Sequence, residues 1–176
     1  SFSHNEFTSL SEEEADEELK RCVKVAEAKS IKLSSFVFPR NKIKHVELLT
    51  EHGFTSFRGK DARVWEMLAP GIPPVYEPLK VSGVVNIRGS LYFVSARGFK
   101  WHIPSWLRLL KVKAGIDHAI ASGKVFHLWT HPVDFADSTD LLLKDFESLL
   151  IYADKKRQEG LLDIKSMGEI AGGLKK

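Results

Sequence analysis

The fold is decided by residues 33–57, which read LSSFVFPRNKIKHVELLTEHGFTSF. The β-prone segment 33–38 is stopped by Pro39, because proline cannot donate a hydrogen bond to a sheet. A short helix with an apolar face follows and is closed by Gly53, after which residues 54–57 read as another strand. This strand–helix–strand order is typical of parallel sheets.

The same alternation continues outward from this stretch. Two capping boxes, Ser11 with Glu14 and Ser166 with Glu169, mark the starts of an early and a late helix. In chain order we expect helix 11–29, helix 60–69, strands 84–87 and 91–94 within an irregular stretch 70–103, one or two helices over 104–123, strand 125–131, helix 138–159, a strand-like segment 161–164 and a last short helix. Helices that alternate with short apolar strands predict an α/β fold.

Length and composition set limits on the class of protein. A chain of 176 residues fits a single domain, residues 1–176. Its net charge of +3 is spread over segments of mixed sign, so we expect no nucleic-acid partner. No apolar run approaches the roughly 18–20 residues of a membrane span, so we expect none. Residues 1–7 read as the middle of a loop, from which we expect further sequence upstream.

One polar group follows the most hydrophobic predicted strand. His131 ends the segment 125–131, and Pro132 then stops the ladder. Ligands of α/β folds meet the carboxyl ends of the strands, so His131 is a candidate functional residue. His127 lies four residues earlier, about 13 Å away along a strand, which is too far for a shared metal ion.

Two other segments place polar side chains beside apolar structure. The turn Phe38-Pro39-Arg40-Asn41 puts a guanidinium and an amide directly after a strand, where arginine could hold a carboxylate. A plain strand-terminating turn is the alternative interpretation. His4 lies in the amino-terminal loop, where a solvated histidine is the alternative to a metal ligand.

Taken together, these segments resemble the polysaccharide deacetylases with the NodB-homology domain, carbohydrate esterase family four, over essentially the whole chain. Ser1-Phe2-Ser3-His4 is similar to the last four residues of that family's His-[Ser/Thr]-x-x-His metal motif. The turn 38–41 is similar to its third motif, although arginine there precedes the proline. Leu128-Trp129-Thr130-His131 is similar to its fifth motif. The Asp-Asp motif that carries the family's base is absent from this sequence.

The resemblance implies a fold, an activity and a set of roles. The fold would be an incomplete, distorted (β/α) barrel of the seven-stranded deacetylase type. The activity would be metal-dependent removal of acetyl groups from N-acetylated, or less commonly O-acetylated, sugars or polysaccharides, with this chain inactive by itself. The implied roles are: His4 as a ligand of Zn²⁺ or another divalent ion, His131 as general acid, Arg40 as the group that orients the catalytic aspartate, and Phe38, Pro39, Asn41, Leu128 and Trp129 as substrate-binding residues.

A second hypothesis is a non-catalytic carbohydrate-binding or scaffold domain with a degenerate barrel. The sequence contains four tryptophans that could stack on sugar rings: Trp65, Trp101, Trp106 and Trp129. Core packing is the more frequent role of tryptophan. In the deacetylase interpretation, the polar loop Arg58–Asp61 is a candidate lining in place of the family's fourth motif, and a solvated loop is the alternative. Nothing in the sequence indicates the oligomeric state, or decides between a cytoplasmic and a cell-envelope location.

Overall fold

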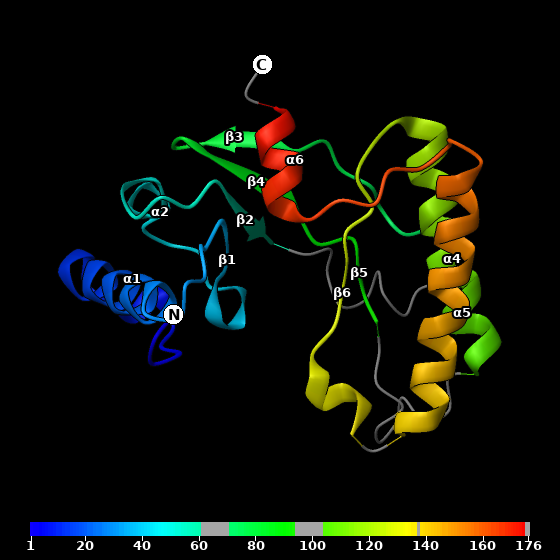
Figure 1. Cartoon of the computed structure of the whole chain (residues 1–176), viewed down its shortest axis with the longest axis horizontal. Coiled ribbons are helices and arrows are strands. Elements are labelled where there is room, and N and C mark those ends of the chain that lie inside the picture. The colour runs from blue at the N-terminus through cyan, green and yellow to red at the C-terminus, as the bar shows by residue number, and fades with distance from the viewer. Residues whose placement is uncertain (61–70, 94–103, 137, 175–176) are drawn as a thin grey trace. The chain divides into compact units, whose positions relative to one another are not determined.

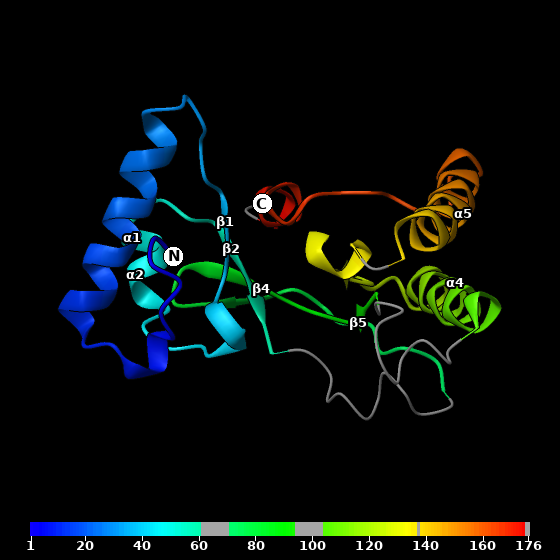
Figure 2. The same cartoon turned by 90° about the horizontal axis from the view of Figure 1, so that it is seen from below.

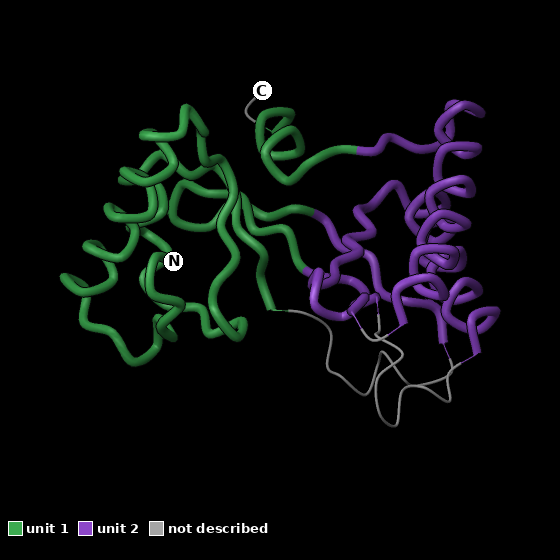
Figure 3. The backbone as a smooth tube through the Cα atoms, turned by 60° about the horizontal axis from the view of Figure 1, so that its bottom comes forward, with its two compact units in different colours: residues 1–60, 78–88, 165–176 green, residues 61–77, 89–164 purple. Residues whose placement is uncertain are grey.

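The computed structural model describes residues 1–60, 71–93, 104–136 and 138–174. The chain divides into two compact units (Figure 3). Unit 1 contains residues 1–60, 78–88 and 165–176, and unit 2 contains residues 61–77 and 89–164. Each unit has its own cluster of buried apolar side chains and is described by itself.

Unit 1 is built on a four-stranded sheet with the strand order β1-β2-β4-β3. Its strands are β1 (Ser35–Val37), β2 (Ser56–Gly59), β3 (Leu79–Val81) and β4 (Val84–Arg88). Strands β1, β2 and β4 are parallel, and helix α2 (Glu47–Glu51) connects β1 to β2. The parallel pair predicted from residues 33–57 is therefore confirmed.

Helices cover both faces of this sheet. Figure 2 shows α1 (Glu12–Glu27) and α2 on one side of the strands and α6 (Met167–Gly173) on the other. Both predicted capping boxes are formed, at the starts of α1 and α6. Edge-to-face ring pairs with centroids 5.0–5.9 Å apart join the aromatic residues of the core, which are Phe7, Phe36, Phe38, Phe54 and Phe57.

Unit 2 contains a second, two-stranded parallel pair. Strand β5 (Leu91–Tyr92) pairs with β6 (Leu128–Trp129), and helix α4 (Ser105–Ser122) lies between them in the sequence. Helix α5 (Thr139–Gln158) lies beside α4 (Figure 1). Gly123 closes α4 in the left-handed conformation, with φ 65°. The two strands are thus linked by the crossover helix that parallel pairing needs.

A buried ion pair joins the two long helices of unit 2. The Nε atom of Arg108 on α4 lies 3.2 Å from Oδ2 of Asp145 on α5, and both side chains are only 5% exposed. The same two helices and two strands contribute to the apolar cluster of unit 2. The low exposure makes this pair costly to break, because the loss of Asp145 would leave the buried guanidinium of Arg108 without its carboxylate.

The predicted elements agree with the structure for most of the described chain. Helix 11–29, strand 33–38, strands 84–87 and 91–94 and helix 138–159 correspond to α1, β1, β4, β5 and α5, and segment 104–123 forms one helix. The predicted strand 54–57 begins two residues later, as β2. Helix 60–69 and residue 94 fall almost wholly outside the described residues.

Three predictions were wrong or incomplete. Segment 161–164 is not a strand, because it has no strand partner in the described chain, and Leu161 and Ile164 are more than half exposed. Of segment 125–131 only Leu128 and Trp129 pair with β5, whereas Val125 forms an isolated antiparallel bridge with Tyr76. Strand β3, whose three residues are all exposed, was not expected, and it pairs with β4 across Ser82 and Gly83.

The α/β fold class is confirmed by the helices and the parallel strands. Within the described residues the strands form two separate sheets and no closed barrel. A seven-stranded barrel of the deacetylase type therefore stays a prediction. The organisation of residues 1–176 as one domain also stays a prediction.

The buried ion pair generates the first test. Replacement of Asp145 by alanine should lower the free energy of unfolding by about 3–5 kcal/mol, because it leaves the guanidinium of Arg108 buried without its carboxylate. Urea unfolding followed by far-ultraviolet circular dichroism measures this change.

Asp154→Ala on the same helix is the matched control. Its ion pair with Arg157 is exposed on both sides, so its loss should cost no more than about 1 kcal/mol. The double variant Arg108→Met with Asp145→Leu should recover most of the stability. An Asp145→Ala protein as stable as the Asp154→Ala protein would contradict the buried ion pair of Arg108 and Asp145.

Candidate functional site

The turn after β1 presents one exposed cation and buries its first two residues. Phe38 and Pro39 are buried, and Pro39–Asn41 forms the 3₁₀ turn η2. Arg40 has φ 52° and ψ 23°, and its side chain is 76% exposed. Its Nη1 atom donates to Oε1 of Glu6 at 2.8 Å. The guanidinium after β1 therefore holds a carboxylate, and this carboxylate belongs to the same chain.

Asn41 faces the sheet. Its Oδ1 atom accepts a hydrogen bond of 2.7 Å from Nη2 of Arg58, a buried residue of β2. Arg58 and Gly59 belong to the strand, so the prediction that residues 58–61 form a loop after it was wrong for these two residues. Asp61 lies outside the described residues. The amide of Asn41 thus helps to hold a buried cation at the carboxyl end of parallel strands.

His4 is exposed and has a left-handed backbone conformation, with φ 59°. The residue before it is fixed by Glu18 of α1, whose Oε2 atom accepts from the backbone N–H of Ser3 at 2.9 Å and whose other oxygen accepts from the Ser3 hydroxyl. Desolvation alone would raise the pKa of Glu18, but these hydrogen bonds from Ser3 lower it overall. Both carboxylate oxygens of Glu18 are therefore engaged by Ser3, the residue before His4.

The described part of the chain contains no ready-made metal site. In this part no group of three or more His, Cys, Asp or Glu side chains is arranged to hold a metal ion. His4 by itself supplies a single nitrogen, whereas protein zinc sites use three or four ligands. The described residues of this chain alone do not make up the predicted metal centre.

The second group of predicted site residues lies at the end of β6 in unit 2. Leu128 and Trp129 are half-buried, and His131 is exposed directly after them. The Trp129 ring stacks on that of Tyr92, with centroids 4.4 Å apart and an interplanar angle of 30°. The His131 ring lies edge-on to both, at centroid distances of 5.4 Å from Trp129 and 6.2 Å from Tyr92. Three rings therefore meet at this strand end.

A carboxylate joins this group from the next turn. Asp134 lies in the 3₁₀ turn η4 (Pro132–Phe135), and its Oδ2 atom accepts from the backbone N–H of His131 at 3.1 Å. The Tyr92 hydroxyl donates to the same oxygen. Desolvation by burial, then this hydrogen bond and the negative charge of Asp134, raise the pKa of Tyr92 above its ordinary value. The tyrosine is therefore a neutral donor at neutral pH.

The structure thus gathers the predicted residues into two local groups. In unit 1 the turn 38–41 is tied to Glu6 and to Arg58. In unit 2 Leu128, Trp129 and His131 lie together, and Tyr92 and Asp134 join them without having been predicted. The sequence signal for Asp134 was its place two residues after the proline that starts a turn, where a carboxylate caps the turn. Tyr92 had no such signal.

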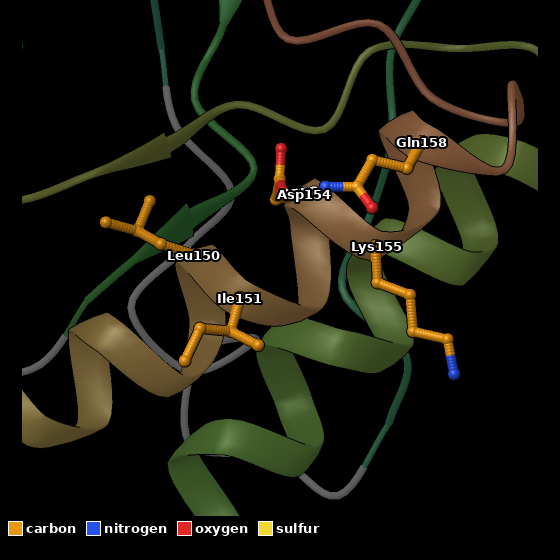
Figure 4. A pocket seen from close by; sticks show the side chains of 5 residues that line it. All are labelled: Leu150, Ile151, Asp154, Lys155 and Gln158. Atoms are coloured by element: carbon orange, nitrogen blue, oxygen red, sulfur yellow. Dashed lines mark hydrogen bonds between the residues drawn. The ribbon is translucent and has the colours of Figure 1, made fainter.

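A shallow hollow runs along α5, apart from the predicted residues (Figure 4). Five side chains of this one helix line it: Leu150, Ile151, Asp154, Lys155 and Gln158. Leu150 and Ile151 are at least half exposed. Since none of the predicted site residues lines this hollow, it does not bear on the chemistry considered above.

Comparison with known proteins adds no relative. No protein-family model, curated protein or solved structure matches this chain. In the part of the chain described, none of the helices has both the length and the apolar character to cross a membrane.

The raised pKa of Tyr92 predicts a pH dependence of stability. An unfolded tyrosine loses its proton near pH 10, whereas the folded Tyr92 keeps it to higher pH. Folding therefore favours the protonated form, and the free energy of unfolding should fall as the pH rises above about 10. In Tyr92→Phe this fall should be shallower, as measured by urea unfolding at a series of alkaline pH values.

Tyr152→Phe serves as the reference variant. Desolvation and the hydrogen bond to Asp117 raise the pKa of Tyr152 to about 12, so this residue contributes a fall of the same sign. The two variants should each remove part of the alkaline loss. An alkaline slope in Tyr92→Phe equal to that of the unmodified chain would contradict the burial and hydrogen bonding of Tyr92.

Proposed function

We propose that this chain is part of a metal-dependent hydrolase that removes acetyl groups from N-acetylated sugars or polysaccharides, with the acid step assigned to His131. The observation that supports the proposal is the strand end at β6. There an exposed imidazole follows a half-buried tryptophan, and its backbone is held by a carboxylate. The carboxyl ends of parallel strands are where α/β enzymes place reacting groups.

The proposed acid step uses the exposed imidazole. Hydrolysis of an acetamide breaks the bond between the carbonyl carbon and nitrogen, and the departing amine must gain a proton. In the proposal His131 in its imidazolium form gives this proton to the nitrogen as the bond breaks. Trp129 would form the apolar surface beside the acetyl methyl group, whereas Leu128 points to the opposite face of β6, packs against the core cluster of unit 2 and would support the strand. The exposure of His131 leaves its ring open to a substrate.

The residues of the turn after β1 are assigned to positioning. Arg40 would orient the carboxylate of the base, and its present pairing with Glu6 demonstrates that its guanidinium can reach a carboxylate at this turn. Asn41 would help to shape the same wall. Phe38 is 1% exposed and packs in the aromatic core, so with Pro39 it would support the turn from beneath.

Zn²⁺ or another divalent ion belongs to the intact enzyme in this proposal, with His4 as one ligand. Such an ion polarises a carbonyl group and acidifies a bound water. The described residues do not form a metal site on their own, so the ion would need further ligands beside His4. The sequence contains no Asp-Asp pair, so in this proposal other residues of the intact enzyme supply the base and the remaining ligands.

A non-catalytic carbohydrate-binding domain is the second candidate. The observation that favours it is the stacked pair of Tyr92 and Trp129, since half-buried aromatic rings are suitable surfaces for sugar rings. Of the other tryptophans, Trp106 on α4 is 65% exposed, and Trp65 and Trp101 fall outside the described residues. This candidate requires binding without turnover.

The test is the release of acetate from N-acetylglucosamine oligosaccharides by the full-length protein that contains this chain. Replacement of His131 by alanine should lower kcat by about 10²–10⁴-fold, because the amine would depart without its proton donor. KM should change little. His118→Ala on α4 is the control, since His118 binds the backbone oxygen of Pro73 and has no proposed role.

Residues 1–176 alone should release no acetate with added Zn²⁺, because the base is missing. Turnover by this chain alone would contradict the proposal that its base is missing. A kcat of His131→Ala close to that of the unmodified protein would contradict the role of His131 as general acid. Binding of the oligosaccharides by a full-length protein without any turnover would favour the second candidate.

A further inference from the structure

One carboxylate connects both strands of unit 2 at the point where they end. Oδ2 of Asp134 accepts from the Tyr92 hydroxyl, at the end of β5, and from the backbone N–H of His131, just beyond β6. The assigned acid residue therefore has an unpredicted partner within its own turn. The proposed acid step assigns no role to Asp134 or Tyr92.

Asp134 holds the backbone of His131 in two ways. Its side chain accepts from the N–H of His131 at 3.1 Å, and its own N–H donates to the carbonyl oxygen of His131 at 2.9 Å. Pro132 begins the turn between them and fixes one backbone angle. Both polar groups of the His131 backbone are thus satisfied by one residue, which restricts the direction in which the imidazole leaves the strand.

Tyr92 extends this restriction to the side chain. Its hydroxyl is tied to Asp134, and its ring is stacked on Trp129. The imidazole of His131 lies edge-on to both rings. A rotation of the imidazole toward β5 or β6 would therefore meet one of two aromatic rings that are themselves held in place.

We propose that Asp134 and Tyr92 are positioning residues for His131. Together they fix its backbone and limit the rotation of its ring, so that the imidazole keeps one orientation. The inference rests on the proposed function, because positioning has a purpose only if His131 reacts. A group held in this manner reaches its proton acceptor without a search over rotamers. An Asp134 side chain that merely starts a turn would stabilise η4 and leave the ring of His131 unaffected.

The experiment compares Asp134→Ala, Asp134→Asn and Tyr92→Phe. Nuclear magnetic resonance on the 176-residue chain measures the ring-proton shifts of His131, which the currents of the Tyr92 and Trp129 rings displace from free-histidine values. Acetate release by the full-length protein gives kcat and KM, and thermal unfolding reports global stability.

In Asp134→Ala the His131 ring shifts should move toward free-histidine values, and kcat should fall by about 100-fold, with KM little changed. Asp134→Asn keeps an oxygen that can accept both hydrogen bonds, so it should recover most of kcat. Tyr92→Phe keeps the stacked ring and should cost about tenfold or less. Asp140→Ala, in the exposed first turn of α5, is the control and should change neither readout.

The outcomes separate this inference from the proposed function. Ring shifts of His131 that stay unchanged in Asp134→Ala overturn the inference, and so does a kcat that stays unchanged while the shifts move. Loss of kcat that Asp134→Asn does not rescue, with a matching loss of thermal stability, also overturns it. A third outcome combines two results: the unmodified full-length protein shows no turnover, while the His131 shifts of the 176-residue chain still respond to Asp134→Ala. That outcome overturns the proposed function and leaves the positioning of His131 standing.

Discussion

The candidate chemistry of this chain depends on the register of one short parallel pair. Tyr92 lies opposite Trp129, and the N–H of Phe93 donates to the carbonyl oxygen of Trp129 at 2.8 Å. Because side chains alternate between the faces of a strand, a shift of one strand by one residue would leave the two rings on opposite faces of the pair. Tyr92 would then leave Trp129, and the carboxylate of Asp134 could no longer hold the ends of both strands.

Helix packing in unit 2 stabilises this register from one side. The ring of Phe126, just before β6, lies so close to Gly115 of α4 that an added Cβ would come within 2.3 Å of it. Phe93, just after β5, packs against Phe135 and Phe146. The helices α4 and α5 that carry these contacts are joined by the buried pair of Arg108 and Asp145. A pair of two-residue strands is thereby held by the apolar core around it.

Local signals predicted much of this fold and only part of the candidate site. Capping boxes, Pro39 and Gly123 are short-range features, so the sequence marks helix starts and element ends directly. Parallel pairing joins residues far apart in the chain, which explains why the place of Tyr92 opposite Trp129 could not be read from the sequence. Strand β3 is different, because it pairs with β4 across only Ser82 and Gly83, a short-range feature that the prediction missed. His131 was found because it follows a strand, whereas the Arg40–Glu6 pair needed the folded backbone.

The most direct measurement is the nuclear Overhauser spectrum of the 176-residue chain, assigned at the indole of Trp129. The parallel register predicts strong cross-peaks between the indole protons and the ring protons of Tyr92, whose centroids lie 4.4 Å apart. Cross-peaks from the indole to the side chain of Leu91 or Phe93 in place of Tyr92 would mean a register shifted by one residue. That result would contradict the arrangement of Tyr92, Trp129, His131 and Asp134 on which the proposed chemistry depends.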